Sequence, residues 1–206
     1  VLPEEGGKII ALATPTKNGG AWFRYKRYDS TEDAAAAAAA FDDEGETVYF
    51  AVNSFKDWYL DESKNKKRIR TQENVHSCRS LYDDFDVGDD PKKYATRKEA
   101  LADIIRIATV LKLTPTITSS GGGYHCYFSL DQDIDKKTWE ELSALKRDVT
   151  THLGVKADRA VDMDSARILR PVGTHNRKKN PPVEVQLVKL GKQYHWKILG
   201  INYKDI

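Results

Sequence analysis

The sequence predicts an α+β fold with a mainly antiparallel sheet, and two observations point to this class. Strand-like runs outnumber helical patterns along the 206 residues, and some of the strands come in pairs that short turns join into hairpins. A doubly wound fold would instead alternate strands and helices along the chain. No repeat or internal linker interrupts the sequence, so we expect a single domain over residues 1–206, which is enough chain to bury a core.

The N-terminal part predicts a hairpin, a helix and a further strand. A Pro- and Gly-containing turn separates two strand-like runs, and Ser30 then precedes seven consecutive alanines, the residue with the highest helix propensity. A polar, basic stretch follows, and we expect it to be a mobile connection in which Trp58 and Tyr59 either pack against the domain or stack on bases. The expected strands are 7–13, 21–28 and 47–52, the helix is 30–40, and the connection is 53–72.

The rest of the chain predicts two long helices among further strands. Thr96 is placed to cap an amphipathic helix that Pro115 ends, and Gly154 follows the second helix. The expected helices are 96–111 and 138–153, and the expected strands are 80–87, 116–119, 124–130, 168–170, 183–187 and 194–199, of which the last two form a closing pair.

The strand-like run Leu81–Gly88 ends in carboxylates. Side chains alternate faces along a strand, so Asp84 and Asp86 point the same way and Asp83 points to the opposite face. Paired carboxylates on a rigid strand suit Mg²⁺ or Mn²⁺, which take hard oxygen ligands and leave positions for phosphate oxygens. Aspartates at a strand end also act as turn and solvation residues, so the pair alone does not establish a metal site.

A glycine-rich loop carries residues that such a site would need. Ser119–His125 contains three glycines, which allow backbone N–H groups to approach phosphate oxygens closely, and ends in a histidine that can donate to a triphosphate. A hairpin turn followed by a buried histidine is the alternative.

Aspartates and arginines follow in the stretch 158–170. Asp158, Asp162 and Asp164 all compete for the role of a third metal ligand. Arg167 and Arg170 offer charge-assisted hydrogen bonds to phosphates, or form a surface network with the aspartates. The donor-rich loop 171–178 then suits phosphates of a nucleotide or a template, or makes an ordinary turn.

Charge is segregated along the chain although the formal net charge is only +2. Basic residues cluster at 64–70 and 177–179, and acidic residues cluster at 83–90, which suits a polyanion that must approach a metal centre; solvated loops are the alternative. No apolar run has the length of a membrane span, no signal-peptide pattern opens the chain, and two cysteines cannot form a disulfide framework. We therefore expect a soluble cytoplasmic protein, and a chain that opens on Val1 suggests a piece of something longer.

In this order and spacing, the segments Leu81–Gly88, Ser119–His125 and Asp164–Asn176 resemble the three motifs of the archaeo-eukaryotic primase superfamily. They are most similar to the primase-polymerase domains of phage and plasmid replication proteins. The resemblance implies an RNA-recognition-like sheet at 76–206, with an N-terminal α/β lobe at 1–75 packed beside it, in a fragment of a longer replication protein.

The resemblance also implies residue roles. Asp84, Asp86 and Asp164 would hold two Mg²⁺ or Mn²⁺ ions, and Asp164 is preferred over Asp162 because it stands before the Ala-Arg-x-Leu-Arg run of the third motif. At the position of Asp83 the first motif often has a hydrophobic residue instead. The residues expected to bind the nucleotide are Ser120, Gly121, Gly122, His125, Arg167, Arg170 and His175.

The implied activity is template-directed nucleotidyl transfer from a deoxynucleoside or ribonucleoside triphosphate. Its partners would be single-stranded or primed DNA and a helicase domain in the parent protein, within a bacterial host cell. The alternatives are a metal-dependent nuclease or nicking protein and a catalytically silent module that binds single-stranded DNA.

Overall fold

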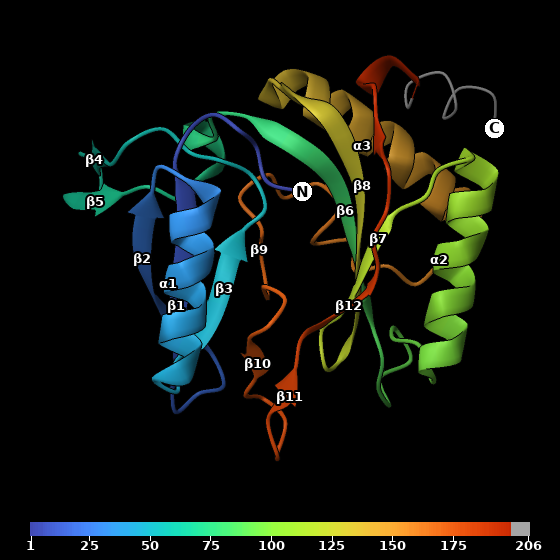
Figure 1. Cartoon of the computed structure of the whole chain (residues 1–206), viewed down its shortest axis with the longest axis horizontal. Coiled ribbons are helices and arrows are strands. Elements are labelled where there is room, and N and C mark those ends of the chain that lie inside the picture. The colour runs from blue at the N-terminus through green and yellow to red at the C-terminus, as the bar shows by residue number, and fades with distance from the viewer. Residues whose placement is uncertain (199–206) are drawn as a thin grey trace.

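Two sheets stand side by side in the computed structural model, which describes residues 1–198 (Figure 1). A four-stranded sheet with helix α1 forms the N-terminal lobe, and a five-stranded sheet covered by α2 and α3 on its outer face forms the second lobe. This confirms the α+β class with mainly antiparallel sheets. No helix in the described part of the chain is both long and apolar enough to cross a membrane.

The N-terminal sheet has the strand order β2-β1-β3-β9, and all its pairs are antiparallel. Ser30 caps α1 by accepting a hydrogen bond from the Asp33 N–H, and the small side chains of Ala34 and Ala38 allow α1 to pack closely on one face of the sheet, against residues such as Leu12 and Val48. The elements are β1 (Lys8–Pro15), β2 (Ala21–Tyr28), α1 (Thr31–Asp43), β3 (Thr47–Ala51) and β9 (Ile168–Leu169). The predicted hairpin and helix are thus confirmed.

One strand of this sheet comes from far along the chain. In β9, Leu169 pairs with Phe50 and Ile168 pairs with Ala51. The N-terminal lobe therefore contains a strand from beyond residue 75, and the segment that bears Arg167 and Arg170 is fixed to the N-terminal sheet.

The stretch 53–72 is not the mobile connection that its polar composition predicts. It folds into a hairpin of β4 (Tyr59–Asp61) and β5 (Lys66–Arg68), and its two flanks are anchored by Phe55 and Ile69, whose exposed fraction is zero. The short helix η1 (Gln72–Asn74) then leads into the second lobe. The prediction failed because two apolar anchors far apart in the sequence produce no periodic pattern of hydrophobic residues that would indicate a folded segment.

The five-stranded sheet is built around the long strand β8, which pairs with β6 on one side and β7 on the other. The capping box of Thr96 and Glu99 starts α2 as the sequence predicts. The elements of this lobe are β6 (Cys78–Asp86), α2 (Arg97–Leu111), β7 (Thr116–Ser119), β8 (Gly123–Ile134), α3 (Lys136–His152), β12 (Gln186–Lys189) and β13 (Gln193–Tyr194), and β10 (His175–Asn176) and β11 (Val183–Glu184) form a separate ribbon.

The expected closing pair of strands is wrong. The first segment splits between β11, which pairs with β10, and β12, which pairs with β7; β13 instead lies parallel to β8. The predicted end of the second segment, Leu199, lies outside the described residues. These strands pair with partners far away in the sequence, so the local sequence does not indicate which strands pair with each other.

A buried ion pair joins β6 to α3. The ammonium of Lys146 donates to Asp83 and, at 2.7 Å, to the Tyr82 carbonyl, and the Lys146 and Asp83 side chains are both fully buried. In addition, the Trp139 indole donates to the Ser80 carbonyl at 2.8 Å. Helix α3 therefore packs against the outer face of β6 through these contacts. The ion pair with Lys146 explains why position 83 holds an acid and not an apolar residue.

We predict that Lys146→Met lowers the free energy of unfolding by about 3–5 kcal/mol, because it leaves the Asp83 carboxylate buried without a partner. The double variant Asp83→Leu/Lys146→Met should recover most of that loss, because apolar residues of similar size replace both charges. Urea denaturation at pH 7 measures both effects, with the exposed Lys137→Met on the same helix as the control. A Lys146→Met protein as stable as the control would contradict the role of the ion pair.

Candidate active site

A polar cavity of about 320 Å³ opens where the five-stranded sheet faces the N-terminal lobe. Acidic and basic residues both line it, and two pairs of them lie within ion-pair distance, Asp86 with Lys93 at 3.1 Å and Asp158 with Arg167 at 3.9 Å. The acidic lining residues are Asp84, Asp86 and Asp158, the basic ones are Lys93, Arg167, Arg170, Lys178 and Lys179, and Ser120, Gly122, His125, Tyr49 and Asn176 also contribute.

The register of β6 against β8 brings the first two motifs together. Asp84 lies opposite His125, and Asp86 lies opposite Gly123. A Cβ atom on Gly123 would come within 2.0 Å of the Phe85 carbonyl oxygen, so only glycine allows the two strands this close approach. Since Asp84 and Asp86 both line the cavity, the predicted alternation along β6 is confirmed.

Asp84 is the most perturbed acid of the cavity. Burial and, to a smaller extent, the nearby Asp86 carboxylate raise the pKa of its carboxyl group to about 7, against the opposing charge of Arg167. Among the residues described, Oδ1 of Asp84 is buried and has no hydrogen-bond partner. Asp86 is more exposed and lies 3.1 Å from the Lys93 ammonium. A buried carboxylate oxygen without a donor is what a bound cation would satisfy.

The third carboxylate of the cavity is Asp158 and not the expected Asp164. The Asp158 N–H donates to the Asp84 carbonyl at 2.9 Å, which holds the two segments together. Oδ1 of Asp164 instead accepts from the Ala166 N–H at 3.0 Å and from the Gln72 amide at 3.3 Å, outside the cavity. Asp162 is buried and paired with Arg147. A series of tight turns between 158 and 167 separates the three acids, and this separation is not visible in their spacing along the sequence.

The donor chemistry fits a hard divalent cation, although a closed cage is absent. Within residues 1–198, no group of three or more His, Cys, Asp or Glu side chains could hold a metal ion. Asp84 and Asp86 nevertheless offer carboxylate oxygens on one strand face, one of them unpaired, and Mg²⁺ and Mn²⁺ accept oxygen ligands from water and phosphate as well. The residues present therefore suit a metal that arrives with, or is completed by, a phosphate ligand.

The glycine-rich loop faces the same cavity through Ser120 and Gly122. Gly121 does not line it. Its φ of +76° makes the turn, and a Cβ there would lie 3.0 Å from Cβ of Asn176. The Asn176 amide donates to the Ser120 carbonyl at 2.8 Å and holds the loop in place.

His125 is buried in the cavity wall and uncharged. Burial, together with the charges of the Arg170 and Arg167 guanidinium groups, lowers the pKa of its imidazole to about 3. The Tyr127 hydroxyl lies 3.4 Å from Nδ1 of this ring. A neutral imidazole keeps one N–H to donate to an anionic ligand, so the ring can orient a phosphate without carrying a positive charge.

The two arginines form the basic wall. Arg170 donates to the Tyr49 hydroxyl at 3.0 Å, and its guanidinium lies 4.9 Å from the centre of that ring. Nε of Arg167 and Nε of Arg170 are buried and have no hydrogen-bond partner within residues 1–198. These donors are available to an anion in the cavity.

His175 lies outside the cavity, contrary to the expectation. Its Nδ1 is 2.6 Å from Oδ2 of Asp42 at the end of α1, its backbone N–H donates to Oδ1 of Asp42, and Arg177 pairs with the same carboxylate. Burial would raise the pKa of Asp42, but the hydrogen bonds from His175 and the charge of Arg177 outweigh burial and hold this pKa below its usual value. His175 therefore tethers the third motif to the N-terminal lobe.

The sequence gives no indication that two further residues line the cavity. Tyr49 comes from the N-terminal sheet and Lys93 from a loop after β6. Lys178 and Lys179 could be noticed as a basic cluster, but only the fold shows that they face the acidic strand.

No protein-family model matches the chain, and no curated protein matches it in sequence. Solved structures of similar fold exist. The primase-polymerase domain of cyanophage S-2L is 13% identical with a TM-score of 0.61, and the alignment covers 96% of this chain and 89% of that one. The catalytic domain of primase RepB' in complex with initiator DNA is 12% identical with a TM-score of 0.54, over 96% and 86% of the two chains. The polymerase domain of Mycobacterium tuberculosis Ligase D in complex with DNA is 14% identical with a TM-score of 0.51, over 98% and 82%. The chain thus has the fold of primase-polymerase domains, as the motifs predict.

We predict that Asp84→Asn stabilises the metal-free protein at pH 8. The pKa of Asp84 in the folded protein, about 7, lies above the usual value of 3.8, so between these pH values the folded state keeps a proton that the unfolded state has lost. The free energy of unfolding therefore falls as pH rises through this window, and the amide removes that loss, by roughly 2–4 kcal/mol at pH 8 and by little at pH 4.

Urea denaturation of both proteins in a chelator at pH 4 and pH 8 measures the difference. The half-exposed Asp86→Asn is the control and should change stability by less than about 1 kcal/mol. Equal stability of wild type and Asp84→Asn at pH 8 would show that Asp84 is not a strained, unpaired acid.

Proposed function

We propose that this chain is a template-dependent nucleotidyltransferase, a DNA polymerase or primase that acts in phage or plasmid DNA replication in the host cytoplasm. One observation carries the proposal: the acids Asp84, which has an unpaired oxygen, and Asp86 line one cavity together with the potential phosphate donors His125, Arg167 and Arg170. The fold shared with primase-polymerase domains supports the same activity.

In the proposed reaction the 3′-hydroxyl of a primer, or of a first nucleotide, attacks the α-phosphate of an incoming triphosphate. A P–O bond forms at the α-phosphorus, the bond to the bridging oxygen of the β-phosphate breaks, the hydroxyl proton passes to water, and pyrophosphate leaves. Two divalent ions, Mg²⁺ or Mn²⁺, would lower the pKa of the attacking hydroxyl and neutralise charge on the phosphates.

The chain's own residues divide into two tasks. Asp84 and Asp86 would provide the carboxylate oxygens for the metal, and Asp158 adds a negative charge to the same cavity. His125 and the two arginines hold the triphosphate, and Ser120 with the backbone of Gly122 closes the cavity around it. Because Arg167 and Arg170 leave donors unpaired, the phosphates would not have to displace existing hydrogen bonds.

The single-stranded or primed template would be held by basic side chains outside the acidic strand. Lys178 and Lys179 lie at the cavity itself, and a helicase in the parent protein would supply the single strand. Such binding weakens as salt increases, because phosphates release counterions on binding.

We predict that the wild type extends a primed single-stranded template with Mg²⁺ or Mn²⁺ and deoxynucleotides, and that Asp84→Ala reduces extension by at least about a hundredfold. Template binding, measured by fluorescence anisotropy, should stay within about threefold, because Asp84 contacts the metal and not the template. The exposed Asp43→Ala serves as the control. Shortening of the template would indicate a nuclease, and template binding without any extension would indicate a silent binding module.

We also predict that substitutions at Asp158 and at Asp164 have very different effects on primer extension. Asp158→Asn should lower extension by about tenfold or more, because it removes a charge from the cavity. Asp164→Asn should retain extension within about threefold, since the amide oxygen can still accept from the Ala166 N–H. The reverse ranking in the same assay would restore Asp164 as the metal ligand.

A further inference from the structure

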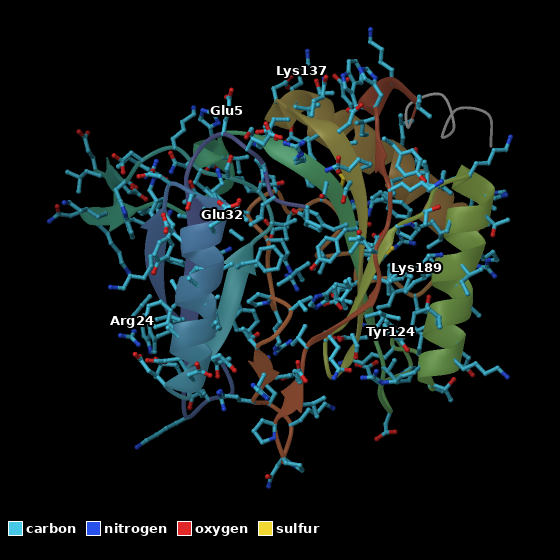
Figure 2. The ribbon with its side chains drawn as sticks, in the orientation of Figure 1. Glu5, Arg24, Glu32, Tyr124, Lys137 and Lys189 are labelled. Atoms are coloured by element: carbon cyan, nitrogen blue, oxygen red, sulfur yellow. The ribbon has the colours of Figure 1, made fainter. Side chains whose placement is uncertain are left out.

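A second concavity, of about 480 Å³, lies between β2 and the β4–β5 hairpin. Figure 1 shows this hairpin beside β2 at the outer edge of the N-terminal lobe. Figure 2 shows Arg24 of β2 on this outer side, away from Tyr124 and Lys189 of the other lobe. The residues that matter here, which we call the aromatic–basic groove, are Trp22, Phe23, Tyr25, Trp58 and the basic strand β5 (Lys66–Arg68).

Two tryptophans of the groove are unusually exposed. Trp22 is 72% exposed and Trp58 is 41% exposed. A tryptophan ring in water forgoes the stabilisation of burial, and it offers a large π-face on which any nucleobase can stack. Because the two rings come from different elements and line one concavity, they can serve successive bases of one strand.

The cations of the groove are partly uncompensated. Within residues 1–198, Lys66 and Lys67 have no carboxylate at ion-pair distance, whereas Arg68 lies 3.2 Å from Asp61. Free ammonium groups next to exposed aromatic rings match the phosphates and bases of a single strand. An apolar protein partner would cover these lysines without providing a counter-charge, so charge complementarity favours a polyanion.

Trp22 lies on the α1 side of the edge strand β2, and Phe23 and Tyr25 lie on the opposite side, from which a row of rings continues to the candidate active site. Ala11 pairs with Tyr25 on one side and with Tyr49 on the other, so both tyrosines lie on the face that α1 leaves uncovered. The rings of Phe23 and Tyr49 are 6.0 Å apart, and Tyr49 lines the active-site cavity. The Arg70 guanidinium lies 5.2 Å from the centre of the Tyr25 ring and stiffens this row.

We propose that the aromatic–basic groove binds single-stranded nucleic acid, the template DNA in the proposed function, by stacking bases on Trp22 and Trp58 and pairing phosphates with Lys66 and Lys67. Only the identity of the strand rests on the proposed function. The row of rings from Tyr25 to Tyr49 then leads the strand toward the cavity. The groove reads no sequence, because stacking and phosphate contacts are common to all bases.

The test is the affinity for a fluorescein-labelled 20-nucleotide single-stranded DNA, measured by anisotropy over a range of salt concentrations. Trp22→Ala/Trp58→Ala should weaken binding by about tenfold or more and leave the salt dependence unchanged, and Trp22→Phe/Trp58→Phe should restore most of the affinity. Lys66→Gln/Lys67→Gln should lower the slope of log affinity against log salt by about 1.4, which corresponds to two phosphates. The control Lys98→Gln/Lys137→Gln removes the same charge from exposed positions on α2 and α3.

The outcomes separate the groove from the proposed function. Weaker DNA binding by the groove variants supports the groove even if the wild type extends no primer, in which case the proposed function alone fails. Unchanged DNA binding by both groove variants would overturn the proposal that the groove binds DNA, even if the wild type is an active polymerase. A 20-nucleotide RNA of the same sequence that binds much more tightly than the DNA, and loses this affinity in the same variants, would overturn the assignment to the template DNA.

Discussion

The antiparallel register of β6 against β8 is the constraint on which the candidate site depends. With Asp84 opposite His125, the acid of the first motif and the imidazole of the second share one face of the sheet. A slip of one residue would turn Asp83 and Phe85 into the cavity and bury Asp84 against α3. Two contacts oppose that slip: the close approach that Gly123 permits at Phe85, and the hydrogen bonds of Lys146 to Asp83 and to the Tyr82 carbonyl. The contacts of β6 with β8 and α3 thus determine that Asp84 and Asp86 are the side chains that face the cavity.

The cavity pairs some of its charges, as in the contact of Lys93 with Asp86, and leaves others unsatisfied. Asp84 retains an unpaired buried oxygen, and Arg167 and Arg170 retain unpaired buried Nε donors. Such unpaired groups destabilise a folded protein, and a ligand that is itself a metal–phosphate complex would satisfy these acidic and basic groups at once. Around the cavity the charges are paired normally, as in the contacts of Asp162 with Arg147 and of Asp42 with His175 and Arg177.

Local signals in the sequence predicted much of the fold, and non-local contacts explain the errors. Caps at Ser30 and Thr96 and the alternation along β6 are determined by neighbouring residues, and all three are confirmed. The anchoring of 53–72 depends on Phe55 and Ile69, which find their partners elsewhere in the fold. The choice between Asp158 and Asp164 depends on a series of turns, and the position of His175 depends on Asp42 in a distant helix. The motifs identified the stretches that meet at the cavity and most of the residues that line it, and missed at Gly121, Asp164 and His175.

The central claim is that Asp84 and Asp86 hold the nucleotide through a divalent metal, and nucleotide binding tests it directly. Calorimetric titration of a deoxynucleoside triphosphate into the protein, with Mn²⁺ and with a chelator, requires no template and no turnover. The structure predicts that wild type binds the triphosphate at least about tenfold more tightly with Mn²⁺, because the protein supplies too few ligands alone and the phosphates complete the set. In Asp84→Asn/Asp86→Asn this metal dependence should disappear. Equal binding by wild type with and without Mn²⁺, or a metal dependence that survives in the double variant, would contradict the claim.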